Sequence, residues 1–343
     1  MAKAEEKEKE KEIVVDFTQS RLKDFMTCPR LEFYKYRAGP KGVGVGPALK
    51  EDYFIEGEFA HYALKHWYVG QKMQRVHMMT RVDKMVAGMG EVDPVIADKI
   101  RAKLAAMIGA CFGYKGSYKG DFDKYEILFV EEPFEFLLGK FRIRGMLDLG
   151  LKDKSDDTQG FMDHKFLQAL KIENYTALPL NIQQLVYTMG FHALTGEFPK
   201  WFIFNFIKKS QLRRKGGTVK NPGKEPWMQY EARVAQQYLD EPGKMFFRPP
   251  PVIVEQKVLE IIKEQVLQWL TAWEVCAEMP DKDLPMTLTS CEGMYGKLCT
   301  FGPACTAFLA GKGKHGWDAP QCKGLYKPKE VLHPELDGKD DED

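Results

Sequence analysis

The sequence lacks any long apolar run. No stretch approaches ~18 consecutive apolar residues, so no transmembrane helix is expected. It also lacks an excess of charge of either sign, since 50 Lys and Arg stand against 49 Asp and Glu and leave a formal net charge of +1. A basic segment followed by an apolar one is missing at the N-terminus, so no secretory signal is expected. Balanced charge excludes a global attraction to nucleic acid, and any such binding requires a local patch.

The composition supports a folded core. Of the 343 residues, 44% are hydrophobic and 12% aromatic, which excludes disorder of the whole chain. Residues 1–15 are dominated by Lys and Glu and are expected to be a charged, disordered tail. A single folded domain is expected at 16–310, with its core at about 120–210, followed by an extension at 311–343 that ends in an acidic tail.

Hydrophobic periodicity predicts helices and strands in alternation. Strands are expected at 125–132, 134–138, 141–151, 160–166 and 201–207, and helices at 51–71, 94–112, 180–194 and 252–278. A further helix is expected to begin after Thr18 or Ser20, either of which can cap it. Residues 209–226 read as a loop rich in Lys, Arg, Gly and Pro. The order of elements predicts an α/β fold with a mixed central sheet flanked by helices.

Three charged residues interrupt two of the apolar strands. Asp148 lies on one strand, and Asp163 and Lys165 lie on one face of the next. Buried charges need a partner, and the simplest one is Mg²⁺ or Mn²⁺ held by the two carboxylates. Lys165 would then lie beside the metal-bound water and neutralise charge on an attacked phosphate. The alternative is structural: Asp148 ends its strand, and Asp163 and Lys165 form an ion pair on an edge strand.

Two further positions are candidates for the same site. Gln183 and Tyr187 are four residues apart on a predicted helix, so they share a face and suit the positioning of a phosphate or a catalytic neighbour. The alternative is a pair of amphipathic residues at a helix surface. His61 lies on an apolar helix, where a histidine is either a metal ligand or a hydrogen-bonded core residue.

In this order the residues resemble the motifs of the PD-(D/E)xK nuclease superfamily, in the branch of RecB-type exonuclease domains. The matching segments are a helix leading into Cys28-Pro29-Arg30, then His61, Gly145 to Asp148, Asp163 to Lys165, and Gln183 to Tyr187. The resemblance implies a restriction-endonuclease-like core. It also implies metal ligation by His61, Asp148, Asp163 and the main chain at His164, catalysis by Asp148, Asp163 and Lys165, and a supporting role for Gln183 and Tyr187.

The seven cysteines are unevenly spread, with four of them late in the chain, which by itself points to a metal. The resemblance implies a [4Fe-4S] cluster that joins the N- and C-terminal helical segments, with the ligands Cys28, Cys291, Cys299 and Cys305. Seven residues separate Cys291 from Cys299, more than is usual in such clusters. Zinc is the alternative, with Cys322 or His315 as a possible ligand, and Cys322 is also a substitute for Cys291.

The substrate expected from the resemblance is DNA, as single strands or duplex ends. The densest basic patch is formed by Lys208, Lys209, Arg213, Arg214 and Lys215. Trp227 and Tyr230 are either base-stacking residues or anchors of the loop on the core. The expected protein is a metal-dependent DNA exonuclease of recombination, repair or replication, in the cytoplasm of a prokaryotic or phage-infected cell.

Two other functions stay open. One is a catalytically silent DNA-binding module that assists a helicase, replisome or recombination partner, and the other is a sequence-specific restriction endonuclease. The sequence has no G-x-x-x-x-G-K-[ST] motif, so any ATP-driven unwinding is expected to come from a partner.

Overall fold

A computed structural model describes residues 15–47, 52–70, 73–88, 93–169, 182–216, 223–291, 299–332 and 336. The charged N-terminal tail, apart from Val15, and the acidic end at 337–343 lie outside the described residues. The strands are β1 (Val15–Thr18), β2 (Val45–Pro47), β3 (Tyr125–Leu138), β4 (Phe141–Asp153), β5 (Gln159–Leu167), β6 (Trp201–Lys208), β7 (Phe246–Phe247), β8 (Val252–Ile253) and β9 (Tyr326–Pro328).

The helices are α1 (Gln19–Thr27), α2 (Pro29–Tyr36), α3 (Asp52–Tyr68), α4 (Arg75–Ala87), α5 (Pro94–Ser117), α6 (Asp121–Lys124), α8 (Ile182–Thr195), α9 (Trp227–Asp240), α10 (Pro242–Met245), α11 (Gln256–Ala277), α12 (Leu288–Cys291) and α13 (Gly302–Leu309). None of the helices in the described ranges is long and apolar enough to cross a membrane.

The central sheet is mixed, as expected. β4 pairs antiparallel with β3 along one edge. Its other edge is shared, because β1 runs parallel to the first part of β4 and β5 runs antiparallel to the last part. β6 then pairs parallel with β5 and antiparallel with the short β7 and β8. The parallel β5–β6 pair is connected through α8, the crossover helix of an α/β fold.

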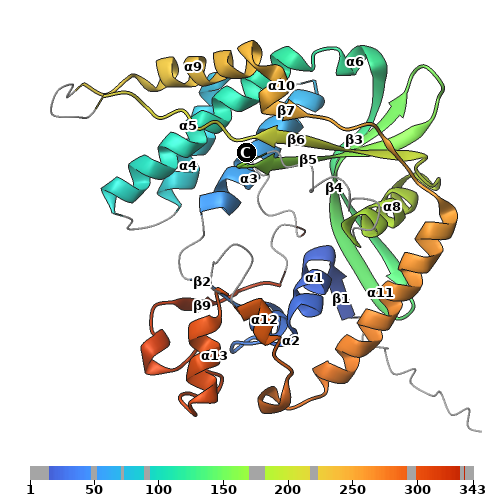
Figure 1. Ribbon diagram of the computed structural model, residues 1–343, viewed down its shortest axis with the longest axis vertical. Helices are drawn as coiled ribbons and strands as arrows, with labels where there is room; N and C mark the ends of the chain where they lie inside the picture. The colour runs from blue at the N-terminus through green and yellow to red at the C-terminus, as the bar shows by residue number, and fades with distance from the viewer. Residues whose placement is uncertain are drawn as a thin grey trace, which may run out of the picture.

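Helices cover both faces of this sheet (Figure 1). β6 is buried over nearly its whole length, and its side chains alternate between two cores. Phe202, Phe204 and Phe206 pack with α1, α8 and α11 on one face. Trp201 and Ile203 pack with α5 and α9 on the other. Since a strand buried on both faces has little freedom to shift, the neighbouring β5 is held in a fixed register.

The sequence predicts the strands β3 to β6 and several of the helices around the core, and the structure differs from the prediction in several places, among them β3, the division of the first helix into α1 and α2, and the added strands β1, β7 and β8. β3 is one continuous strand, although a break was expected before Phe134. Pro133 lies within it, which is tolerated because β3 pairs on one edge only. The helices α4 and α9 were not predicted. The expected cap at Thr18 is confirmed, since its hydroxyl accepts a hydrogen bond from the Arg21 amide at 3.2 Å.

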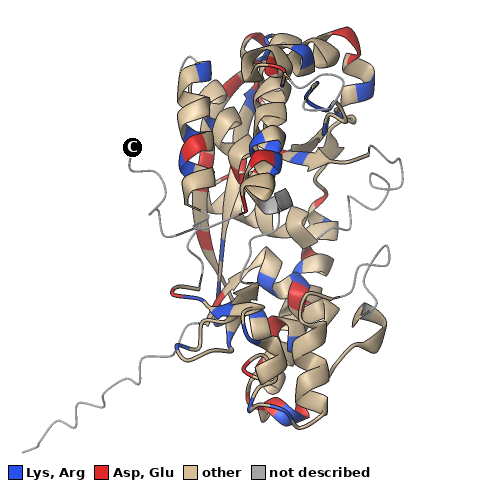
Figure 2. Cartoon of the chain, turned by 90° about the vertical axis from the view of Figure 1, so that its left-hand side faces the viewer, with Lys and Arg blue, Asp and Glu red and all other residues tan. Residues whose placement is uncertain are grey.

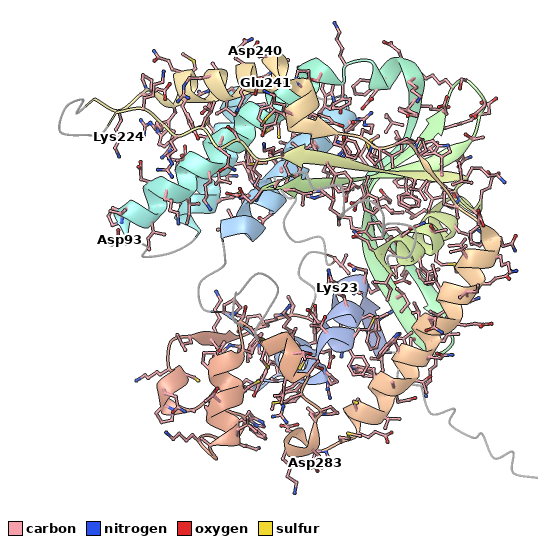
Figure 3. All side chains as sticks on the ribbon, viewed as in Figure 1. Lys23, Asp93, Lys224, Asp240, Glu241 and Asp283 are labelled. Atoms are coloured by element: carbon pink, nitrogen blue, oxygen red, sulfur yellow. The ribbon has the colours of Figure 1, made fainter. Side chains whose placement is uncertain are left out.

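The first and last described segments pack together. Arg30 on α2 donates hydrogen bonds to the carbonyls of Asp281 and Leu284, and the Tyr34 ring stacks on Phe301 with centroids 5.2 Å apart. β2 pairs with β9 in a separate two-stranded sheet. Figure 3 shows Asp283 in the same part of the molecule as α2 and α13. Segments about 250 residues apart in the chain (the Arg30–Leu284 separation is 254) therefore form one small core beside the sheet.

Candidate active site

The site forms where β4 and β5 separate. Leu149 pairs with Met162, and continuing the same register places Asp148 opposite Asp163, one step beyond the last paired residues. The Asp148 carboxylate accepts a hydrogen bond from the His164 amide at 2.7 Å, in place of a main-chain partner. Asp148 is 7% exposed and Asp163 is 1% exposed. Strand pairing thus brings together two buried carboxylates that are 15 residues apart in sequence.

The lysine and the glutamine predicted from the sequence meet at Asp163. Lys165 Nζ lies 2.9 Å from Asp163 Oδ1 and 2.7 Å from Oδ2. Gln183 Nε2 donates to Asp163 Oδ1 at 3.0 Å, across from α8. The carboxylate is therefore oriented from its own strand and from a helix, while its Oδ2 makes no hydrogen bond of good geometry in the described structure.

Tyr187 lies one turn after Gln183 and packs its ring against Phe134 and Phe161, with centroids 6.1 and 6.2 Å away. Burial, followed by the nearby Asp163 carboxylate, raises the pKa of Tyr187 well above its ordinary value, so the phenol stays protonated. Gly190, a turn later on the same helix, lies against the Phe134 ring, where an added Cβ would come within 2.6 Å. This contact sets how closely α8 approaches the sheet.

His61 on α3 completes the cluster. Its Nδ1 lies 3.0 Å from Glu131 Oε1 and 3.6 Å from Asp148 Oδ2. Burial alone lowers the pKa of His61, but the Asp148 and Glu131 carboxylates outweigh it and raise the pKa to about 9. His61 thus faces the carboxylates, as the metal-ligand alternative and the family resemblance require, and does not lie within the apolar core.

Glu131 was not predicted as a site residue. It lies on β3 between the partners of Leu149 and Leu147, so it is opposite Asp148. Its backbone φ of 49° is in the left-handed region, which is uncommon for a residue with a side chain. One ligand atom each from His61, Glu131 and Asp148 lies within 4.8 Å of the others. Because the position of its side chain depends on this local backbone conformation of β3, the alternation of side chains along the strand did not predict it.

The electrostatics of the cluster favour a bound cation. Burial raises the pKa of Asp163 to about 6, with Asp148 adding to the rise and Lys165 opposing it. Burial also raises the pKa of Asp148, and Glu131 contributes in the same direction. Carboxylate oxygens are the donors that suit Mg²⁺ and Mn²⁺, and an imidazole is a donor more usual for a transition metal such as Mn²⁺ than for Mg²⁺, so the residues fit a divalent cation.

The His164 side chain points to the opposite face of the sheet. Its Nδ1 lies 2.9 Å from Asn205 Nδ2, and its ring stacks on Tyr68 with centroids 5.7 Å apart. Burial lowers the pKa of His164 well below its ordinary value, so the ring is neutral. The main chain of His164, and not its ring, faces Asp148. The family resemblance likewise assigns the main chain of His164, and not its imidazole, to the metal site.

The basic residues predicted to bind nucleic acid are divided between the wall of one cavity and positions outside it. Lys209, Arg213 and Arg214 line a cavity between α5 and the segment after β6, whereas Lys208 and Lys215 do not line it. Lys209 is 8% exposed and forms an ion pair with Glu56.

The aromatic pair near that loop is held within the protein. Arg214 lies over the Trp227 ring, 3.6 Å from its centroid. Tyr230 is buried and donates to the Leu212 carbonyl at 2.9 Å. Both aromatic residues are thus anchors of the loop, the second of the two alternatives drawn from the sequence.

Four of the seven cysteines line one small cavity between the chain's first and last described segments. They are Cys28 between α1 and α2, Cys291 at the end of α12, and Cys299 and Cys305 around the start of α13. Burial raises the pKa of the Cys305 thiol to about 12, and the buried Arg30 guanidinium opposes this rise. Cys322 and His315 do not line the cavity. The four thiols line one cavity beside a cation and are the donors that a thiolate-bound metal or cluster uses, although among the described residues only His61, Glu131 and Asp148 bring three ligand atoms within 4.8 Å of one another.

Comparison with known families gives one match. The model of the PD-(D/E)XK nuclease superfamily matches residues 16–306, well over half of the chain. No curated protein matches the sequence.

Proposed function

Because the chain belongs to the PD-(D/E)XK nuclease superfamily, we propose that it is a metal-dependent DNA exonuclease that hydrolyses phosphodiester bonds of single strands or duplex ends. One observation supports this most: Asp148, Asp163 and Lys165 converge with His61 at the fork between β4 and β5. An isolated ion pair on an edge strand would need neither the second buried carboxylate nor the histidine.

In this proposal His61, Asp148 and Asp163 hold one or two Mg²⁺ or Mn²⁺ ions, with the main chain of His164 beside them. Glu131 joins this set because its carboxylate meets both His61 and Asp148. When bound, the ion activates water and neutralises charge on the phosphate.

The other side chains orient the Asp163 carboxylate and neutralise charge on the phosphate. Lys165 carries its ammonium group next to Asp163, where it can donate hydrogen bonds to a phosphate oxygen and stabilise the charge that develops there. Gln183 fixes the Asp163 carboxylate from α8 by donating a hydrogen bond to Oδ1, while Oδ2 lies next to the Lys165 ammonium group. The Tyr187 ring secures that helix against Phe134 and Phe161.

The test uses linear and circular DNA of one sequence, single-stranded and duplex, with Mg²⁺, Mn²⁺ or EDTA. We expect loss of linear DNA that requires metal, with circular DNA intact. Opening of the circles would contradict exonuclease action and favour an endonuclease. Binding of DNA without any hydrolysis would favour the catalytically silent module that assists a helicase or recombination partner.

The proposal includes a [4Fe-4S] cluster held by Cys28, Cys291, Cys299 and Cys305. Its support is that these four thiols, and not Cys322, line one cavity. Zinc has the same four thiols available, so metal analysis decides between them. The role of the cluster in either case is to tie α1 and α2 to the segment around α13.

A further inference from the structure

A second cavity lies close to the proposed active site. Its volume is about 460 Å³, within the range of small-molecule pockets and large enough for one nucleotide. Gln168 in its wall lies directly after the end of β5 and follows Lys165 by three residues, about 10 Å at the spacing of an extended chain. Glu56, also in the wall, precedes His61 on α3 by five residues, about 7.5 Å along the helix. The cavity is thus a few nucleotide steps from the metal ligands.

The wall of this cavity carries a large excess of positive charge. Among the described residues of the wall, the cationic side chains are Lys99, Lys103, Lys209, Arg213 and Arg214, and the only carboxylate is that of Glu56. Outside the wall, the Asp98 carboxylate lies 3.8 Å from Arg214. Glu56 is buried and forms ion pairs with two of these cations, Lys209 and, at 3.4 Å, Lys103. Figure 2 shows acidic and basic residues mixed along the helices on this side of the molecule, so the excess of cations belongs to the wall of the cavity and not to the helices as a whole.

The arrangement of these cations is fixed by the protein. Lys209 is held at the end of β6, where its amide donates to the Leu167 carbonyl at 2.7 Å. Arg214 is held over Trp227, and Lys224 pairs with Asp98 of α5 at 3.1 Å, which ties the loop to that helix. Figure 3 shows Lys224 and Asp93 on the same side of the molecule. Within the described part of the chain, no carboxylate pairs with the Arg213 guanidinium.

We infer that this cavity binds the 5′-terminal phosphate of the strand being degraded. This rests on the proposed function. A terminal phosphomonoester carries a charge of about −1.5 to −2 near neutral pH, as a phosphorylated side chain does, and so suits a wall with several cations better than the single charge of an internal phosphodiester does. The apolar side of the cavity, formed by Ala102, Ala106, Met107 and Leu212, provides a surface for the attached nucleoside. Natural 3′ ends usually carry a hydroxyl, which has no negative charge to pair with these cations.

The experiment measures binding of three single strands of one sequence to the full-length protein in EDTA, so that no hydrolysis occurs. One strand has a 5′-phosphate, one has hydroxyls at both ends, and one has a 3′-phosphate. Fluorescence anisotropy with an internal label gives each Kd. We expect the 5′-phosphate to tighten binding about tenfold, and the 3′-phosphate to have no effect.

Two variants and a control locate the effect. The double variant Lys103→Gln and Arg213→Gln should bind all three strands with Kd values within about twofold of one another. Arg213→Gln alone changes an exposed residue and should reduce the 5′-phosphate preference without affecting folding. Lys263→Gln removes the same charge from the exposed surface of α11 and should keep the full preference.

Equal Kd values for the three strands with the wild type would overturn the inference, as would a preference for the 3′-phosphate or a preference that survives in the double variant. Hydrolysis of the same strands in the presence of metal tests the proposed function separately from the cavity. Metal-dependent loss of both 5′-phosphorylated and 5′-hydroxyl strands at equal rates would sustain the exonuclease and reject the cavity. A 5′-phosphate preference without hydrolysis would sustain the cavity and reject the exonuclease.

Discussion

Single residues at the fork of β4 and β5, where we propose the active site, are ionisable groups that are buried at a cost in stability. Asp163 is almost fully buried, and its pKa of about 6 means that the folded protein resists its ionisation even with Lys165 in contact. A residue that only stabilised the fold would have the opposite shift. The arrangement is explained if a cation supplies the missing positive charge.

Asp163→Asn should therefore stabilise the metal-free protein at pH 8. The unfolded carboxyl titrates near pH ~3.9 and the folded one near 6, so its stabilising contribution is present below the lower value and is lost as the pH rises through the higher one. Thermal unfolding in EDTA should give a higher Tm for the variant at pH 8 and a smaller difference at pH 5. A variant that is less stable than the wild type at both pH values would contradict this account.

Lys165→Met should reduce the rate of hydrolysis by about 10²–10⁴-fold, because its ammonium group acts next to the reacting phosphate. The Kd for DNA in EDTA should change little, since the cavity proposed to bind the terminal phosphate is lined by five other cationic side chains. Lys152→Met is the matched control: Lys152 is on β4 and pairs with the exposed Asp157 at 2.8 Å, away from the site. Near-normal turnover in Lys165→Met would remove Lys165 from the mechanism.

At the scale of elements, β4 is the organising strand. It carries Asp148 between the part that pairs with β1 and the part that pairs with β5. At this point no strand is hydrogen-bonded to that edge of β4 within the described residues, so the Asp148 carboxylate can accept a hydrogen bond from the His164 amide. Phe134 on β3 then fills the space left by Gly145 of β4 and Gly190 of α8, where added Cβ atoms would approach its ring to 2.5 and 2.6 Å. The glycine of the Gly145–Asp148 motif is thus needed for packing.

Gly190→Ala should lower the free energy of unfolding by about 1–3 kcal/mol, because its Cβ has no space against the buried Phe134 ring. Gly57→Ala provides the comparison, since Gly57 lies inside α3 with nothing within 4 Å of the added atom. That change should raise stability by about 0.5–1 kcal/mol. Urea unfolding of the two variants measures both values, and a neutral Gly190→Ala would show that α8 can move away from the sheet.

These elements explain how far the sequence predicts the molecule. Asp148, Asp163 and Lys165 are visible in the sequence because charge inside an apolar strand is costly and therefore conspicuous. Glu131 was missed because its position depends on a left-handed backbone at one residue of β3, which the alternation of side chains does not encode. The loop after β6 was correctly predicted as basic, but the burial of Lys209 against Glu56 depends on α3, 153 residues away.

At the scale of the whole molecule, the cysteine cavity connects the N-terminal helices to the segment around α13. Cys28→Ser should abolish the brown colour and the iron content of protein purified without oxygen, and should lower its Tm, because ligation contributes folding free energy. Cys276→Ser should keep the brown colour and the iron content, since Cys276 does not line the cavity. Stoichiometric zinc without iron in the wild type would reject the cluster.

The contact of Arg30 with Leu284 also constrains the order of events during synthesis. A ribosome adds about 5–20 residues per second, so the 254 residues between these partners take roughly 13–50 s to emerge. Throughout that interval the side chains of Tyr34 and Arg30 on α2 remain hydrated and accessible to other nascent chains, although both are buried in the folded protein. Chaperone occupancy at the beginning of the chain is the expected consequence, released only when the segment that follows α11 has left the ribosome.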